Sequence, residues 1–236
     1  MNDEMNSMEC SDVKNTKTKS YIYVALVKAH TGLGAIARAL FRYEYTHIAV
    51  CMEEPLQDFV TFSRRKHYAP FDCGFMHETL DCYAYGDHKN VKLKVFKVPV
   101  TDRNRARIER YINKIENDKD YIFNVYSMAT MGILHGFRIY KAENCMSFVS
   151  RIVEMSGAVF MDKPFYKYNI KELDALLKPY MYREELFYPK EKKTLGYMDK
   201  IPAKKNICMF LSLNGKLIQR ILTKRSIESY IELERK

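Results

Sequence analysis

The sequence predicts an α+β fold in which a small antiparallel sheet packs against helices. Residues 47–52 and 57–63 are short β-branched and aromatic runs separated by a turn signal, and together they predict a β-hairpin. Residues 91–98 (VKLKVFKV) alternate between apolar residues and lysines, which is typical of a strand with one exposed face. Residues 102–117 and 144–155 space their apolar side chains as amphipathic helices do.

The first third of the chain adds one strand and a long loop to this prediction. Residues 1–20 are polar and mixed in charge, and we expect a disordered leader. Residues 21–28 (YIYVALVK) predict the first strand, and residues 35–42 (AIARALFR) have helical composition. Residues 64–87 contain proline and two glycines without a clean period, so they predict a long, functional loop.

The predicted helices have recognisable ends. Thr101 or Asp102 is expected to cap the first helix. Residues 121–134 are apolar nearly all round, which predicts a buried helix or a pair of helices. Gly157 is expected to close the second amphipathic helix, and residues 171–177 predict a short helix after it.

Residues 190–236 are predicted to form a basic extension of a domain that spans residues 21–189. Two apolar runs, 207–213 and 216–222, flank Asn214-Gly215, so this extension is predicted to contain a small hairpin. The whole chain has 39 Lys+Arg against 29 Asp+Glu and a net charge of +10, and the extension alone holds 12 Lys+Arg against 5 Asp+Glu.

The charge distribution and the cysteines restrict the partners and the compartment. A nucleic-acid footprint is normally a basic stripe on the folded domain, so the charge of this extension makes nucleic acid an unlikely partner for the domain itself. The chain contains six scattered cysteines, no export signal and no apolar run long enough to span a membrane. These features predict a cytoplasmic protein with free thiols and no membrane span.

Cys145 and His47 form the strongest candidate catalytic pair. Cys145 follows Asn144, a favourable N-cap residue, and so lies in the first turn of an amphipathic helix. The positive end of the helix dipole favours a thiolate there, and the free backbone N–H groups can hold an oxyanion. His47 opens a core strand, from which an imidazole can accept the thiol proton. The alternative is a small buried Cys145 and an ordinary core histidine.

Two segments resemble a known family. Residues 45–50 (YTHIAV) resemble the histidine strand, and residues 144–149 (NCMSFV) the cysteine helix, of circularly permuted NlpC-type papain-like cysteine hydrolases. The resemblance is to the YiiX/YaeF-like kind, which is related to the lecithin:retinol acyltransferase group. In this branch the histidine precedes the cysteine, as here. The similarity covers about residues 21–180 and implies a permuted papain-like fold.

The family also uses a third polar residue, often Glu or His, on the strand after the histidine. Thr61 aligns with this position and would orient His47, with Ser63 and Asp58 as the alternatives. Side chains alternate across a strand, so Thr61 and Ser63 share one face and Asp58 lies on the other. A hydroxyl stabilises an imidazolium less than a carboxylate would.

Substrate contacts are expected from Arg64, Ser63 and Gly74, all within the part of the chain that resembles the family. Arg64 also opens a basic run, Arg64–His67, that could bind a carboxylate or a phosphate.

A metal site is the weaker interpretation of the next segment. Cys73, His77, Cys82 and His88 lack the close paired spacing of zinc modules, so we expect no metal. The resemblance requires no organic cofactor either.

The sequence therefore predicts a cysteine-dependent hydrolase or acyltransferase. Cys145 would attack an amide, ester or thioester carbonyl of a peptide-like or lipid-like acyl substrate, with His47 as general base and then general acid. A hydroxyl as the third residue motivates the alternative, a catalytically silent ligand-binding module of the same fold. In a further hypothesis, the basic extension recruits the protein to nucleic acid or to an anionic membrane. The sequence makes no prediction of the oligomeric state.

Overall fold

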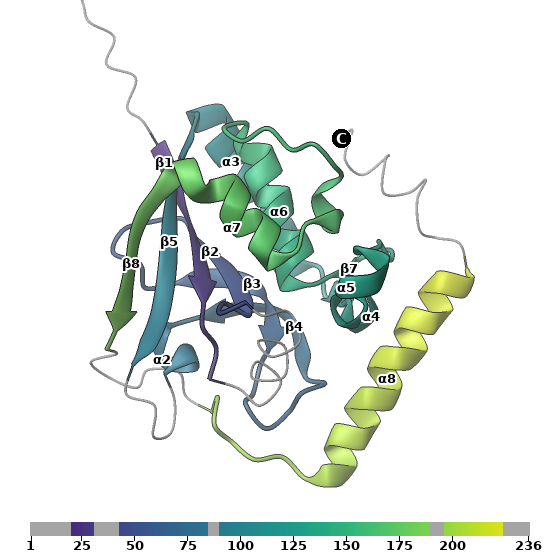
Figure 1. Ribbon diagram of the computed structural model, residues 1–236. Helices are drawn as coiled ribbons and strands as arrows, with labels where there is room; N and C mark the ends of the chain where they lie inside the picture. Colours follow the sequence, from purple (N-terminus) through teal and green to yellow (C-terminus); the bar gives the residue numbers. More distant parts are fainter. Residues whose placement is uncertain (1–19, 31–42, 85–89, 189–195, 224–236) are drawn as a thin grey trace, which may run out of the picture.

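The structure, a computed structural model, describes residues 20–30, 43–84, 90–188 and 196–223 (Figure 1). Its centre is a six-stranded sheet in the order β4-β3-β2-β1-β5-β8, in which every neighbouring pair is antiparallel. The strands are β1 (Ser20–Val27), β2 (His47–Cys51), β3 (Phe59–Arg64), β4 (Cys73–Glu78), β5 (Val91–Val100) and β8 (Met181–Phe187).

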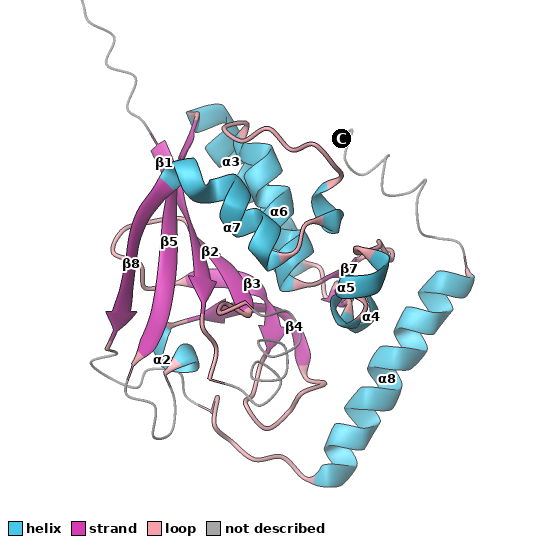
Figure 2. Ribbon diagram, in the orientation of Figure 1, coloured by secondary structure: helices cyan, strands magenta, loops and turns pink. Residues whose placement is uncertain are grey.

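The helices lie between and after the strands along the chain, and Figure 2 shows them in cyan. They are α2 (Leu80–Tyr83), α3 (Asp102–Asn117), α4 (Val125–Ala129), α5 (Met131–Leu134), α6 (Cys145–Ser156), α7 (Ile170–Leu177) and α8 (Ala203–Leu222). Two 3-10 turns, η1 (Phe165–Lys167) and η2 (Lys178–Tyr180), flank α7. A second, parallel pair of strands, β6 (Ile122–Phe123) and β7 (Ala142–Glu143), leads into α6. The α+β prediction is therefore confirmed.

The predicted strands and amphipathic helices lie close to their expected positions. β2 and β3 pair as the expected antiparallel hairpin, and β5 is the alternating strand. Thr101, rather than Asp102, caps α3, because its hydroxyl accepts a hydrogen bond from the backbone N–H of Asn104. Gly157 closes α6 in the left-handed conformation, at a φ of 69°, which glycine adopts without steric cost.

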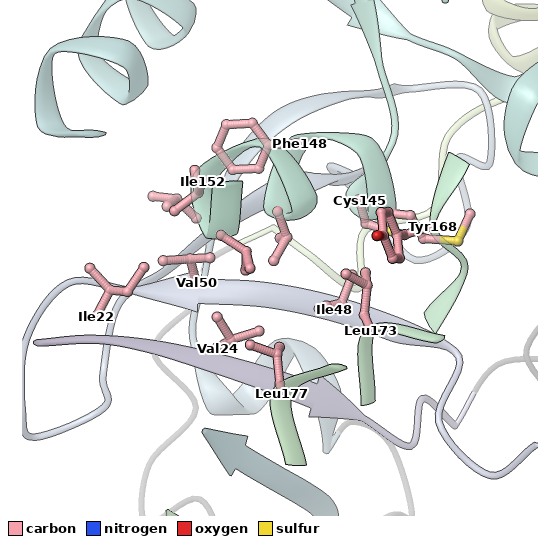
Figure 3. Packing of buried hydrophobic residues seen from close by; sticks show 14 of the residues in the cluster. Ile22, Val24, Ile48, Val50, Cys145, Phe148, Ile152, Tyr168, Leu173 and Leu177 are labelled. Carbon is pink, nitrogen blue, oxygen red and sulfur yellow. The ribbon is translucent and has the colours of Figure 1, made fainter. Parts of the chain in front are cut away.

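The sheet separates two hydrophobic cores. Alternate residues of β1 (Ile22, Val24 and Leu26) join a core with α3, α6 and α7, which we call the helix-side core. The residues between them, Tyr23, Ala25 and Val27, join the opposite core. Figure 3 shows the helix-side core, where Phe148 and Ile152 of α6 and Leu173 and Leu177 of α7 pack against β1 and β2.

The structure differs from the sequence predictions in several segments. Residues 64–87 are not one irregular loop, because β4 pairs with β3 over six residues and α2 follows it. Residues 121–134 contain the predicted pair of helices as α4 and α5, but β6 precedes them and the segment is not buried throughout, because Ile133 and Leu134 are exposed. β8 was not predicted, since its pattern of mostly exposed residues lacks a buried face.

The predicted C-terminal hairpin is a single helix, α8. Asn214-Gly215 does not form a turn because the Asn214 side chain is bonded within the helix and to the body of the protein. Its Nδ2 donates to the Phe210 carbonyl over 2.7 Å, and its Oδ1 accepts from the Tyr126 hydroxyl over 2.7 Å. The predicted leader, apart from Ser20, and the helical segment 35–42 lie outside the described residues.

The helix α8 is fastened to the domain along its length. Leu213 and Leu217 are buried in a third, small core with Ile122, Ile139 and Ala142. The Arg220 guanidinium donates to three backbone carbonyls, those of Tyr140 (3.0 Å), Lys141 (2.8 Å) and Asp120 (2.6 Å). Among the described residues, no helix combines the length and the hydropathy that a membrane crossing requires.

Candidate active site

Cys145 is the first residue of α6, and the local structure holds it rigidly. Asn144 is the N-cap, and it exchanges hydrogen bonds with Ser147 in a capping box, each of 3.0 Å. Ser147 also donates to the Glu143 carboxylate. The Cys145 side chain is buried in the helix-side core (Figure 3). The predicted position of the cysteine in the first helical turn is therefore the position that the structure shows.

The helix start leaves hydrogen-bond donors beside the thiol. The capping asparagine satisfies the N–H of Ser147, whereas the N–H groups of Cys145 and Met146 have no partner within the helix, as in any first turn. The Asn144 side-chain Nδ2 is buried, and none of the described residues accepts a hydrogen bond from it. A developing negative charge near Cys145 would therefore meet the free backbone N–H groups of the first turn.

His47 is held by a carboxylate that the sequence analysis did not identify. Its Nε2 lies 2.7 Å from the Glu78 Oε2, and both side chains are well buried, with 13% and 2% of their surface exposed. His47 is the first residue of β2 and Glu78 is the last residue of β4, and the Tyr83 ring lies beside the His47 ring, with ring centroids 5.9 Å apart.

The Glu78 carboxylate is itself fixed in its ionised form. The Tyr83 hydroxyl from α2 donates to the same Oε2 over 2.7 Å. Burial alone would raise the pKa of Glu78, but the charge of His47 and hydrogen bonds from His47, Tyr83 and Ser63 outweigh it and lower the pKa below its usual value.

The same contacts favour the protonated form of His47. Burial alone would lower the pKa of His47, but the charge of Glu78, a hydrogen bond to Cys145 and the hydrogen bond to Glu78 raise it from 6.5 to about 10. Since Glu78 occupies Nε2, Nδ1 is the ring nitrogen left to exchange a proton with the Cys145 thiol. The arrangement is a thiol, an imidazole and an orienting carboxylate in sequence.

Glu78, and not Thr61, is therefore the hydrogen-bond partner of the His47 ring. The Thr61 hydroxyl is fully buried and donates to the Ile48 carbonyl over 2.8 Å, so it supports the strand that carries the histidine. Asp58 points away from the site and accepts from His77. Ser63 contributes indirectly, through its hydrogen bond to Glu78.

The residues expected to bind substrate make contacts within the protein. The Arg64 guanidinium donates to the His67 carbonyl over 3.2 Å, and Arg65 pairs with Asp72 over 3.2 Å. Gly74 is buried opposite Ser63, and a Cβ there would lie 2.5 Å from the Arg65 guanidinium. This basic run therefore braces the β3–β4 hairpin, and the structure shows no free cation at Arg64.

The candidate metal ligands do not converge. Within the described ranges, no group of three or more His, Cys, Asp or Glu side chains could hold a metal ion. Cys73 packs in the helix-side core and Cys82 in the opposite core, whereas His77 is held by Asp58 and Glu116 at the surface. His88 lies outside the described residues.

Sequence reasoning missed Glu78 because it treated residues 64–87 as one loop. The segment Cys73–Glu78 contains a glycine and a histidine, and only Gly74 and Glu78 are buried, so the apolar alternation that marks a strand is absent.

Comparisons with family models, curated proteins and solved structures find no match to this chain.

Proposed function

We propose that the protein is a cysteine-dependent hydrolase or acyltransferase that acts on an amide, ester or thioester bond. The observation that carries the proposal is the buried Glu78–His47 pair, 2.7 Å apart, whose ring also interacts with Cys145. A nucleophile, a base and a group that orients the base form the constellation that nucleophilic catalysis needs.

Each member has a defined role in the reaction. His47 holds the proton of the Cys145 thiol as an imidazolium, which its raised pKa favours, and the Cys145 sulfur forms a bond to the acyl carbon. The bond from that carbon to the leaving group then breaks, and the imidazolium gives its proton to the leaving nitrogen, oxygen or sulfur. A water molecule or an acceptor alcohol or amine, deprotonated by His47, releases the acyl group and restores the thiol. Glu78 stabilises the imidazolium throughout.

Backbone and side-chain donors would stabilise the oxyanion that forms between these steps. The Cys145 N–H is placed for this purpose by the capping box. The buried Asn144 Nδ2, which lacks a partner among the described residues, is the second candidate. Asn144→Asp preserves the cap, because Asp is also a good N-cap residue, but removes this donor. We expect it to slow acylation by about tenfold or more.

The family resemblance supports the choice of chemistry and substrate. In a permuted papain-like fold the histidine strand would precede the cysteine helix, as β2 precedes α6 here. The substrate class remains a peptide-like or lipid-like acyl compound in the cytoplasm. The alternative, a catalytically silent binding module, was motivated by a hydroxyl as the third residue. The hydrogen-bond partner of the His47 ring is instead the Glu78 carboxylate, which favours the enzyme.

The test is acylation of Cys145 by an activated substrate. The full chain is incubated with an acyl thioester and with a p-nitrophenyl acyl ester, and the acyl-enzyme is mapped by mass spectrometry. We expect a transient adduct on Cys145 that is lost in Cys145→Ala and forms at least a hundredfold more slowly in His47→Gln.

The exposed Cys208 provides the matched control. Cys208→Ser should leave the rate and the site of acylation unchanged. A wild-type protein in which acyl groups reach Cys208 but never Cys145 would contradict the proposed function.

A further inference from the structure

The outward face of α8 carries an apolar stripe that none of the residues described in the structure covers. Exposed large apolar side chains recur along one side of the helix, at Ile207, Leu211, Ile218, Ile221 and Leu222, and between two-fifths and three-quarters of each is exposed. Spacings of four, seven and four residues place 207, 211, 218 and 222 on one face. Single exposed apolar residues are ordinary, but a continuous stripe marks an interaction surface.

This stripe is distinct from the face that holds α8 on the domain. Leu213 and Leu217 face the domain and are buried, and Arg220 is bonded to backbone carbonyls. Figure 1 shows α8 running along the outside of the molecule. The helix therefore has one face bound to the protein and a second apolar face that points outward.

The charge of α8 indicates what the stripe contacts. Between Ala203 and Leu222 the helix contains Lys204, Lys205, Lys216 and Arg220 and no acidic residue. Lys205 and Lys216 are exposed and lie on the side of the helix away from the stripe, whereas the exposed Lys204 lies at the N-terminal end of the stripe, one turn before Ile207. Apolar residues on one face with lysines on the other are typical of helices that lie in the interface of an anionic membrane.

A second copy of the chain fits this face less well. Pairing two α8 helices through their stripes would cover the apolar residues but would give Lys205 and Lys216 no anionic group to contact, because neither helix carries an acidic residue. Nucleic acid would use the lysines but would leave the apolar stripe exposed to water. An anionic lipid surface satisfies both features.

We propose that α8 docks the protein on the surface of an anionic phospholipid bilayer, with the stripe of Ile207, Leu211, Ile218, Ile221 and Leu222 at the headgroup–acyl boundary. The helix lies in the plane of the interface and does not cross the membrane. The docking does not depend on the Cys145 chemistry, although it would bring a lipid-like acyl substrate to the enzyme.

Vesicle co-sedimentation of the full chain tests this proposal. One set of vesicles contains phosphatidylcholine only, and the other contains phosphatidylcholine with phosphatidylglycerol. We expect the protein to bind the anionic vesicles at least tenfold more tightly than the neutral ones. Lys204→Gln with Lys205→Gln and Lys216→Gln should weaken anionic binding by about fivefold per lysine. Cys145→Ala should bind as the wild type does, which separates this proposal from the proposed function.

Two double variants with the same charge change isolate the stripe. Leu211→Glu with Ile218→Glu places two carboxylates in the stripe, and Ser212→Glu with Gln219→Glu places two on an exposed face outside it. The first pair should lose at least ten times more binding than the second. Circular dichroism checks that both variants keep α8.

Several outcomes would overturn the proposal. If the two double variants lose vesicle binding equally, the protein adsorbs by charge alone. The same conclusion would follow if the protein binds DNA and if Leu211→Glu with Ile218→Glu leaves that DNA binding unchanged. A dimer in light scattering that only Leu211→Glu with Ile218→Glu dissociates would assign the stripe to a second copy. Failure of the wild type to bind anionic vesicles at low salt would remove the docking surface altogether.

Discussion

Replacing Glu78 by Gln should shift the titration of His47 more than any other single change at the site. The substitution keeps the size and a hydrogen-bonding oxygen but removes the negative charge 2.7 Å from Nε2. In the wild type the pKa of His47 is raised from 6.5 to about 10, against the effect of burial. That rise corresponds to a preference of about 5 kcal/mol for the imidazolium in the folded protein.

The charge of Glu78 can account for most of this preference. Two unit charges about 4 Å apart interact by about 4 kcal/mol at an effective dielectric constant of about 20. Without that charge, burial opposes the imidazolium and only the interaction with Cys145 favours it. We therefore expect the pKa of His47 to fall to about 7 or lower in Glu78→Gln.

The measurement is an NMR titration of the His47 ring between pH 5 and 11. The protein is labelled with carbon-13 at its six histidines, and His47→Gln identifies the His47 signal. Glu116→Gln is the matched control, because Glu116 is the carboxylate on a different histidine, His77. It should leave the His47 titration unchanged. A His47 pKa that stays near 10 in Glu78→Gln would refute the electrostatic account of the site.

Three further predictions concern stability. The raised pKa of His47 contributes stability that is full below pH 6.5 and is lost as the pH rises toward about 10. The lowered pKa of Glu78 contributes stability that is full above pH 4.5 and is lost on acidification. The free energy of unfolding in urea is compared between the wild type and the double variant His47→Gln/Glu78→Gln. The difference should be largest between pH 4.5 and 6.5, and a difference that does not change with pH would contradict this account. Asn144→Ala and Asn169→Ala remove equivalent capping boxes, and each should lower the free energy of unfolding by about 1 kcal/mol. Only Asn144→Ala should also slow the acylation of Cys145. Equal effects of the two variants on acylation would contradict a local role of the Asn144 cap at Cys145. Leu217→Ala should weaken the packing of α8 on the domain by about 2–3 kcal/mol. Ile218→Ala changes the next residue, which is half-exposed, and should alter this packing by less than about 0.5 kcal/mol. Limited proteolysis of α8 measures the difference, and equal cleavage rates in the two variants would show that Leu217 does not anchor the helix.

The sequence predicts best where one periodic pattern controls an element. The alternation in 91–98 and the capped amphipathic pattern of 144–155 lead directly to β5 and α6. The position of Cys145 follows from the same local rules, because an asparagine cap and the helix period fix the first turn without any distant contact.

The orienting carboxylate depends on contacts that no local pattern encodes. Glu78 contacts His47 from 31 residues away in the sequence, and the two side chains meet only because β2 and β4 lie in the same folded sheet. Likewise, α8 was predicted as two strands because Asn214-Gly215, a common hairpin turn, separates two apolar runs. Its helical form depends on burial of Leu213 and Leu217 and on the bond from Tyr126 to Asn214.

The three hydrogen bonds of Arg220 have a practical consequence for where the functional unit ends. Two of the carbonyls that Arg220 contacts belong to Tyr140 and Lys141, only a few residues before Cys145, and the third belongs to Asp120. A chain cut after residue 189, the predicted end of the domain, would lose this support for the segment that enters α6. The smallest fragment suitable for enzymology should therefore extend past Arg220.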